Sequence, residues 1–190
     1  MHELLIAKIS TYIDLNDQDK LLIQELFIPR KILKNEYFLL EGKVCHEVAF
    51  INSGLFRYFI DVDGDPKTIA FSKENEFMSN YESYLPKEPS TKYIQALEDA
   101  ELLILHRDNL DRFYAQVAEG DRFGRKVMEE LFVHYLKALG AFYTASPEER
   151  YLSLVKDQPE LLQRISQYHI ASYLGIQPQS LSRIRGRIGL

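Results

Sequence analysis

The sequence predicts an α+β protein that combines an N-terminal antiparallel β-roll, a long helix and a C-terminal group of short helices. Two observations carry this prediction. From about residue 28 to residue 106, short β-branched and aromatic runs alternate with turn residues, as in an antiparallel roll. After Asp108, apolar residues recur at helical spacing instead. We therefore expect a β-roll domain in residues 1–120, a long helix and hinge in residues 121–145, and a helical domain in residues 146–190.

Two short packing helices are expected before the roll. The first carries three isoleucines on one face: Ile6, Ile9 and Ile13. Asn16 or Asp17 can cap a second helix over about residues 18–26, because each side chain can accept a hydrogen bond from a free helical amide.

The clearest hairpin of the roll pairs residues 55–60 with residues 67–71. Between them lies Asp63-Gly64, a pair that tolerates the positive φ of a tight reversal. Three acidic residues surround this turn: Asp61, Asp63 and Asp65. They are interpreted as solvated and not as a calcium loop, because the distal glutamate of that loop is missing.

The long helix carries two apolar faces. One is a seam at alternating spacings of four and three, made of Met128, Phe132, Tyr135, Leu139 and Phe142. A seam of this kind calls for a partner helix, so we expect a homodimer. The alternative is that the seam packs only on the β-roll of its own chain. The second face is expected to cover that roll and is made of Phe123, Val127, Leu131 and Leu136.

A hinge is expected around Ala145. Residues 146–149, Ser-Pro-Glu-Glu, form a capping box in which the Ser146 hydroxyl and the Glu149 carboxylate bond the free amides of a new helix. This helix is expected to run to about Lys156. Its predicted inward residues are Tyr151, Leu152 and Val155.

Basic charge is concentrated at the C-terminal end. The chain has a net charge of -5, yet no Asp or Glu follows Leu162. Four arginines lie in that last segment: Arg164, Arg183, Arg185 and Arg187. The first 161 residues then hold 19 basic and 28 acidic groups, a net charge of -9. Such asymmetry indicates an anionic partner for the C-terminal segment.

Residues 167–184 have the spacing of a helix-turn-helix. Gly175 can adopt the left-handed conformation that ends the first helix, and Pro178 lacks an amide proton where the second helix leaves one unpaired. Ala171 is small where the two helices must approach each other. The apolar residues expected between the helices are Ile170, Leu174, Leu181, Ile184 and Ile188.

The opposite face of the second helix is predicted to bind the major groove of double-stranded DNA. Arg183 can make bidentate bonds to guanine and Gln179 to adenine, so Arg183 is the strongest candidate for base discrimination. Ser180 and Ser182 are permissive donors beside them. The groups expected to hold phosphates are Arg185 and Arg187, with Tyr168, His169, Ser172 and Arg164 as further backbone contacts.

The chain resembles the Crp/Fnr family of bacterial transcription regulators. Residues 174–184 are the most specific segment, and residues 19–22 and 36–42 resemble the beginning of the family's roll. The resemblance implies a cyclic-nucleotide-binding-like β-roll, a dimerisation helix and a C-terminal winged helix-turn-helix. It further implies a homodimer that binds a pseudo-palindromic operator and contacts RNA polymerase.

Two departures from the family pattern concern the operator and the wing. The family's main base-reading positions fall on Pro178, Gln179 and Arg183, and Pro178 has no side-chain hydrogen-bond donor. The operator is therefore expected to differ from the best-known family consensus. Only two residues follow Ile188, so the wing is expected to be absent or to be supplied by upstream strands.

The resemblance also implies a pocket at the family's cyclic AMP site, but the residues at the aligned positions are not those that bind the nucleotide. The family's glutamate falls on Asn80 and its arginine on Ser90; Glu76 and Thr91 belong to the same segment. Because a buried cyclic phosphate needs a charge-assisted partner, we predict that cyclic AMP does not control the protein. Lys87 or Lys92 could replace the arginine as the cation. Three tyrosines either line an altered pocket for an unknown small-molecule effector or pack the roll: Tyr81, Tyr84 and Tyr93. The alternative function is a small-molecule sensor in which DNA binding is subordinate.

Several other classes of protein are disfavoured. No segment approaches the length of a membrane span and no signal peptide is recognised, so the cytoplasm is the expected location. Cys45 is the single cysteine and is interpreted as a buried small hydrophobe. The scattered histidines His46, His106 and His134 do not indicate haem. We find no nucleophile elbow, phosphate loop or metal cluster, and therefore expect no catalytic residues, no metal and no cofactor.

Overall fold

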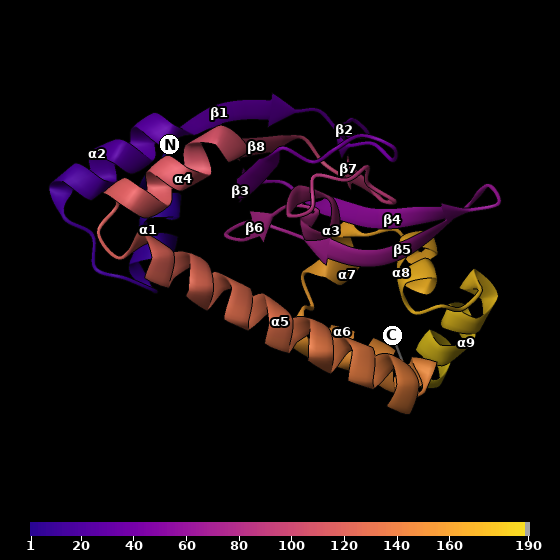
Figure 1. The fold of residues 1–190 in the computed structure, drawn as a ribbon. Coiled ribbons are helices and arrows are strands. Elements are labelled where there is room, and N and C mark those ends of the chain that lie inside the picture. The colour runs from indigo at the N-terminus through magenta and orange to yellow at the C-terminus, as the bar shows by residue number, and fades with distance from the viewer. Residues whose placement is uncertain (189–190) are drawn as a thin grey trace. The chain divides into compact units, whose positions relative to one another are not determined.

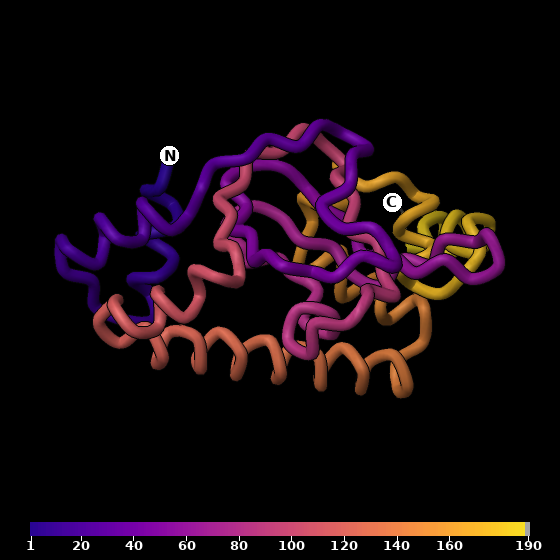
Figure 2. Tube along the Cα trace, turned by 45° about the horizontal axis from the view of Figure 1, so that its top comes forward, coloured from indigo at the N-terminus to yellow at the C-terminus, as the bar shows by residue number. Residues whose placement is uncertain are grey.

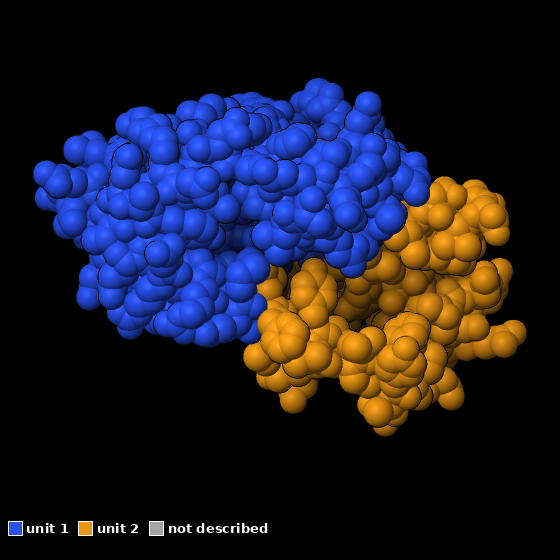
Figure 3. Space-filling model, viewed as in Figure 1, with its two compact units in different colours: residues 1–58, 71–130 blue, residues 59–70, 131–190 orange. Residues whose placement is uncertain are grey.

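The computed structural model describes residues 1–188 of the 190-residue chain. The chain divides into two compact units (Figure 3). The first contains residues 1–58 and 71–130, and the second contains residues 59–70 and 131–190. None of the helices in the described part is long and apolar enough to span a bilayer.

Two short helices open the first unit: α1 (Glu3–Ser10) and α2 (Asp17–Leu26). Asn16 caps α2, because its side chain accepts a bond from the Asp19 amide while the Asp19 carboxylate accepts one from the Asn16 amide. This confirms the predicted cap. The expectation for Ile13 was wrong in one respect, since α1 ends three residues earlier, although Ile13 is buried.

The β-roll consists of two four-stranded sheets (Figure 1). The first has the order β1-β8-β3-β6, with strands Phe27–Ile32, Ala100–His106, Glu47–Ser53 and Phe77–Met78. The second has the order β2-β7-β4-β5, with strands Tyr37–Leu39, Tyr93–Ala96, Phe56–Val62 and Asp65–Ser72. Antiparallel pairing joins β1 to β8, β8 to β3, β3 to β6 and β2 to β7. A single turn of helix, α3 (Tyr81–Tyr84), lies between β6 and β7.

The core of the roll is aromatic and aliphatic. Its fully buried side chains include Phe27, Phe50, Phe56, Met78 and Ile94. Cys45 is 2% exposed, which confirms its interpretation as a buried hydrophobe. Burying an apolar side chain of this size stabilises the fold by about 1.5–3 kcal/mol, so this cluster is the main source of the roll's stability.

The β4–β5 hairpin turns at Asp63-Gly64, as predicted. Both residues have positive φ, 54° and 83°, and the Gly64 amide donates a 2.7 Å bond to Asp61 Oδ1. Asp65 pairs with Lys67. Among the described residues no group of acidic, histidine or cysteine side chains could hold a metal ion.

Two helices follow the roll: α4 (Arg107–Gln116) and α5 (Gly120–Thr144). In both ribbon and tube views α4 lies beside α2, and Arg112 Nη2 is 2.9 Å from Glu25 Oε1 (Figures 1 and 2). The start of α5 also approaches α4 closely, because a Cβ at Gly124 would lie 2.7 Å from Tyr114 Cε1. A larger residue at position 124 would therefore displace the Tyr114 ring from this crossing.

The predicted covering face of α5 is confirmed for its first half only. Phe123 and Val127 are buried, and the Phe123 ring lies 5.5 Å from the rings of Phe77 and Phe113. Leu131 is half-buried, but Leu136 is 52% exposed, so the expectation for Leu136 was wrong. The helix continues in the second unit beyond the residues that pack on the roll.

Four further helices make up the rest of the described chain: α6 (Pro147–Asp157), α7 (Leu161–Arg164), α8 (Gln167–Tyr173) and α9 (Pro178–Ile188). The Ser146–Glu149 capping box of α6 is confirmed. Tyr151 and Leu154 are buried, whereas Leu152 is 43% exposed, which corrects the predicted inward face. The buried residues follow a spacing of three, and Leu152 lies about 100° away around the helix.

Candidate nucleic-acid interface

Helices α8 and α9 form the predicted helix-turn-helix scaffold. Gly175 has a φ of 69°, and the Ile176 amide donates to the Ala171 carbonyl at 3.0 Å, which closes the turn. Ser166 caps α8 by accepting a 3.2 Å bond from the His169 amide. All five core residues at the crossing are under 7% exposed: Ile170, Ala171, Leu174, Leu181 and Ile184. Ile188, also expected between the helices, is half-buried. The apolar side of the motif is therefore as predicted except at this last position.

The opposite side of α9 carries donors that face water. Gln179, Ser182 and Arg183 are exposed, and Ser180 is half-buried. Within residues 1–188, Arg183 forms no ion pair. A guanidinium and an amide that remain hydrated in the free protein are available to bond an incoming partner.

The remaining predicted basic contacts differ from one another. Arg187 Nη2 lies 2.6 Å from Glu148 Oε2, so this arginine is already paired within the domain. Arg185 is half-buried, and its Nε is buried without a hydrogen-bond partner among the described residues. Tyr168 on α8 is 48% exposed and lies edge-on to the His169 ring at 5.5 Å.

Ser172 has a partner that the sequence did not indicate. Its hydroxyl accepts a 2.9 Å bond from the Thr68 amide and donates at 3.2 Å to the Pro66 carbonyl, so it is held by the β4–β5 hairpin within the second unit. Every described element after β8 is a helix, so no wing follows α9 within the described residues.

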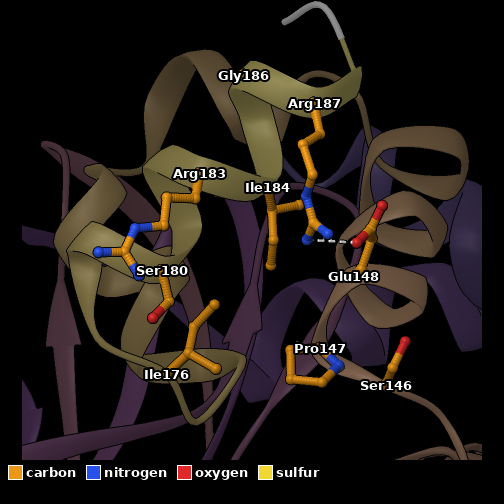
Figure 4. A pocket seen from close by; sticks show the side chains of 9 residues that line it. All are labelled: Ser146, Pro147, Glu148, Ile176, Ser180, Arg183, Ile184, Gly186 and Arg187. Atoms are coloured by element: carbon orange, nitrogen blue, oxygen red, sulfur yellow. Dashed lines mark ion pairs between the residues drawn. The ribbon is translucent and has the colours of Figure 1, made fainter.

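A groove of about 810 Å³ lies between the N-terminus of α6 and α9 (Figure 4). It is lined by Ser146, Pro147, Glu148, Ile176, Ser180, Arg183, Ile184, Gly186 and Arg187. Figure 4 shows the Arg187 side chain reaching from α9 to Glu148, while Arg183 extends in another direction. The groove therefore brings three of the predicted DNA-binding residues, Ser180, Arg183 and Arg187, near a carboxylate on a different helix.

Arg150 is a positioning residue that sequence reasoning missed. Its guanidinium donates to the carbonyls of Ala145 at 2.7 Å and Leu174 at 2.6 Å, and it lies 5.3 Å from the ring of Phe142. It thus ties the end of α5 to the turn of the helix-turn-helix. Because the acceptors are backbone carbonyls, no pattern of side chains in the sequence could have indicated this role.

In the predicted ligand pocket of the roll, Asn80 and Ser90 form hydrogen bonds within the protein. Asn80 Nδ2 donates to Ser90 Oγ at 2.8 Å, and Ser90 Oγ bonds both the carbonyl and the amide of Lys92. Asn80 and Ser90 are only 4% and 3% exposed. The Lys92 ammonium, considered above as a replacement cation, lies 2.5 Å from Glu82 Oε2.

The other two residues predicted to line that pocket, Glu76 and Thr91, take no part in the Asn80–Ser90 hydrogen bond. The Glu76 carboxylate accepts a bond from the Lys73 amide in the turn before β6, and Thr91 is exposed. Tyr84 is buried and packs against Arg107, whose guanidinium is 4.1 Å from its ring centroid. Burial raises the pKa of Tyr84 to about 12. Tyr84 therefore packs the roll as a neutral phenol, which agrees with one of the two alternatives for the tyrosines.

The predicted seam of α5 is strongly apolar and open to water. Met128 is half-buried, and the other four side chains are 54–65% exposed: Phe132, Tyr135, Leu139 and Phe142. Val133, Leu136 and Tyr143 extend the same exposed segment. An apolar surface of this kind is typical of an interaction site.

Comparisons with known proteins agree with the fold. Residues 29–117 match the family model of the cyclic nucleotide-binding domain. The fold is similar to that of a transcriptional regulator assigned to the Crp/Fnr family from Eubacterium rectale, with a TM-score of 0.70 and 19% identity over 94% of this chain and 88% of that chain. A CooA variant from Carboxydothermus hydrogenoformans gives 0.71 and 17% over 94% and 87%. FixK2 from Bradyrhizobium japonicum gives 0.70 and 15% over 86% and 84%. No curated protein sequence matches the chain significantly.

Proposed function

We propose that this chain, which has a cyclic nucleotide-binding domain in residues 29–117 and the fold of Crp/Fnr transcription regulators, is itself a sequence-specific DNA-binding regulator. The observation that carries the proposal is the two-sided helix α9. Leu181 and Ile184 are buried on one side, and Gln179, Ser182 and Arg183 face water on the other. This is the arrangement that a recognition helix needs, because the apolar side fixes the helix while the polar side enters the groove.

The proposed DNA contacts divide into base-reading and backbone-holding roles. Arg183 reads guanine through its two-pronged guanidinium, and Gln179 reads adenine. Ser180, Ser182, Arg185, Arg187 and Tyr168 hold phosphates and fix the register. We assign no catalytic step to the protein. It is proposed to regulate transcription in the cytoplasm by contacting RNA polymerase.

The exposed seam of α5 supports a homodimer. Phe132, Tyr135, Leu139 and Phe142 follow the coiled-coil spacing and are more than half exposed, so a second copy of α5 would remove this apolar surface from water. A two-fold dimer requires a pseudo-palindromic operator, with half-sites about one helical turn apart.

The Asn80–Ser90 pair supports independence from cyclic AMP. These positions lack the carboxylate and the guanidinium expected at a cyclic nucleotide site, and their polar groups already bond each other in a buried environment. Binding cyclic AMP here would break satisfied buried hydrogen bonds without offering an arginine to the phosphate.

One experiment tests the proposed function. Full-length protein selects sequences from random DNA, with and without cyclic AMP, and the affinity for the recovered site is then measured for wild type, Arg183→Ala and the control Arg125→Ala. Arg125 is exposed on α5 and pairs with Glu129 outside the helix-turn-helix. We expect a pseudo-palindrome, the same affinity with cyclic AMP, and a loss of about 1–3 kcal/mol of discrimination at one base pair per half-site for Arg183→Ala.

Two results would overturn the proposal. Selection that recovers no preferred sequence removes the regulator function. An Arg183→Ala protein that discriminates as well as wild type removes the recognition role of α9. A site recovered only with cyclic AMP present would instead favour the ligand-controlled alternative.

A further inference from the structure

The groove of the C-terminal domain contains an ion pair between α9 of the helix-turn-helix and α6, which precedes the motif. Arg187 belongs to the last turn of α9, and Glu148 belongs to the first turn of α6. Their Nη2 and Oε2 atoms are 2.6 Å apart (Figure 4). The Arg187 side chain is 64% exposed and the Glu148 side chain is 34% exposed. The arginine is thus accessible to a partner from solvent while the carboxylate is partly enclosed.

Glu148 lies at the N-terminus of α6, where a negative charge is favourable. The N-terminus of a helix stabilises a negative charge through the helix dipole and the free amides of its first turn. Glu148 is not part of the Ser146–Glu149 capping box; it lines the groove, where its carboxylate pairs with Arg187. The Glu148 carboxylate is therefore an intramolecular anion that pairs with Arg187, the same guanidinium that is proposed to bind a DNA phosphate.

We propose that Glu148 competes with DNA for Arg187, so that operator binding must open the Arg187–Glu148 ion pair. This inference rests on the proposed function. A phosphate placed on the same guanidinium would lie within a few ångströms of the Glu148 carboxylate, and the two anions would repel each other. Glu148 thereby lowers the affinity for every DNA sequence and leaves base discrimination to Arg183 and Gln179.

The expected size of the effect is modest. Exposed ion pairs stabilise proteins only weakly, so releasing Arg187 from Glu148 should tighten DNA binding by about two- to fivefold. The gain should be largest at low ionic strength, because salt screens exposed charges.

A double-mutant cycle on the full-length protein tests the inference. The affinity for the selected operator is measured at low salt for wild type, E148Q, R187Q and the double variant. E101Q is the control, since it removes the same charge from an exposed ion pair with Lys31 in the β-roll. Thermal unfolding of each variant verifies that the capping box and the fold are retained. We expect E148Q to gain affinity in the presence of Arg187 and to gain none in the R187Q background, with E101Q like wild type.

Each other outcome overturns the inference in a distinguishable way. An equal gain in both backgrounds means that Glu148 only repels DNA at a distance. A loss of affinity in E148Q means that Glu148 positions Arg187 for the phosphate. Wild-type operator binding with no effect of E148Q overturns this inference alone, whereas wild-type protein that prefers no sequence overturns the proposed function with it.

Discussion

The polar side chains of helix α9 and those of Asn80 and Ser90 differ in their exposure and hydrogen bonding. On α9, Arg183 and Gln179 are exposed above an apolar layer. In the roll, Asn80 and Ser90 are almost fully buried and bond each other. A hydrated donor can exchange water for a ligand, but a satisfied buried donor must first lose its protein partner. Of these two regions, only α9 therefore presents polar side chains that a partner can bond without breaking a buried hydrogen bond.

Substitutions in the two regions should affect different properties of the protein. Replacing an exposed donor of α9 should change DNA affinity and leave the fold intact, because surface substitutions are usually within about 0.5 kcal/mol. Replacing a member of the buried pair should change the stability of the roll instead. Substitutions in the two regions should therefore differ in whether they change DNA affinity or the stability of the fold.

The largest effect is expected from the apolar layer beneath the exposed face. Leu181 is fully buried between α8 and α9, so Leu181→Ala should destabilise the helix-turn-helix by about 2–5 kcal/mol through lost contacts and a cavity. Hydrogen exchange of the α8 and α9 amides measures this local stability. Leu152→Ala is the matched control in α6, since Leu152 is 43% exposed. Equal exchange in the two variants would contradict the idea that this layer fixes the recognition face.

A smaller effect is expected in the roll. Ser90→Ala leaves the Asn80 amide donor and the Lys92 backbone amide without their acceptor, at a cost of about 1–3 kcal/mol in the free energy of unfolding. Urea unfolding of the variant measures the loss. Thr91→Ala, at the exposed neighbouring position, serves as the control. If Ser90→Ala instead left stability unchanged and altered the affinity for the operator, the division between the two regions would not hold.

Much of the fold follows from local patterns in the sequence. The Asn16 and Ser146 caps, the Asp63-Gly64 turn and the Gly175 break depend on a few neighbouring residues, and all lie where the sequence predicted them. The buried face of the helix-turn-helix was predictable for the same reason, since helical periodicity alone assigns Leu181 to the interior.

The contacts made across long sequence distances could not be predicted. Arg150 bonds a carbonyl 24 residues away, and Ser172 bonds the hairpin 104 and 106 residues away. The pairing of Arg187 with Glu148 is of the same kind. Residue type indicates that such side chains need partners, but only the tertiary fold determines which partner is within reach. The sequence could therefore propose site residues by their type, but it could not indicate which of them already have a partner in the folded chain.

The smallest effect is expected from the charge that caps α6. The Ser146 amide donates a 2.7 Å bond to the Glu149 carboxylate and the Ser146 hydroxyl also interacts with it, which holds the pKa of Glu149 below its ordinary value of 4.5. A lowered folded-state pKa adds stability that is present above the unfolded value and is lost as the pH falls through the folded value. Wild type should therefore melt slightly above Glu149→Gln at pH 7, and the difference should shrink as the pH falls below the ordinary pKa of 4.5 and through the lower folded-state pKa. The control is Glu101→Gln, whose exposed carboxylate caps no helix. Melting temperatures of the three proteins from pH 7 to pH 3 measure the effect; a difference that persists in acid would show that the Glu149 side chain stabilises α6 by its shape and not by its charge.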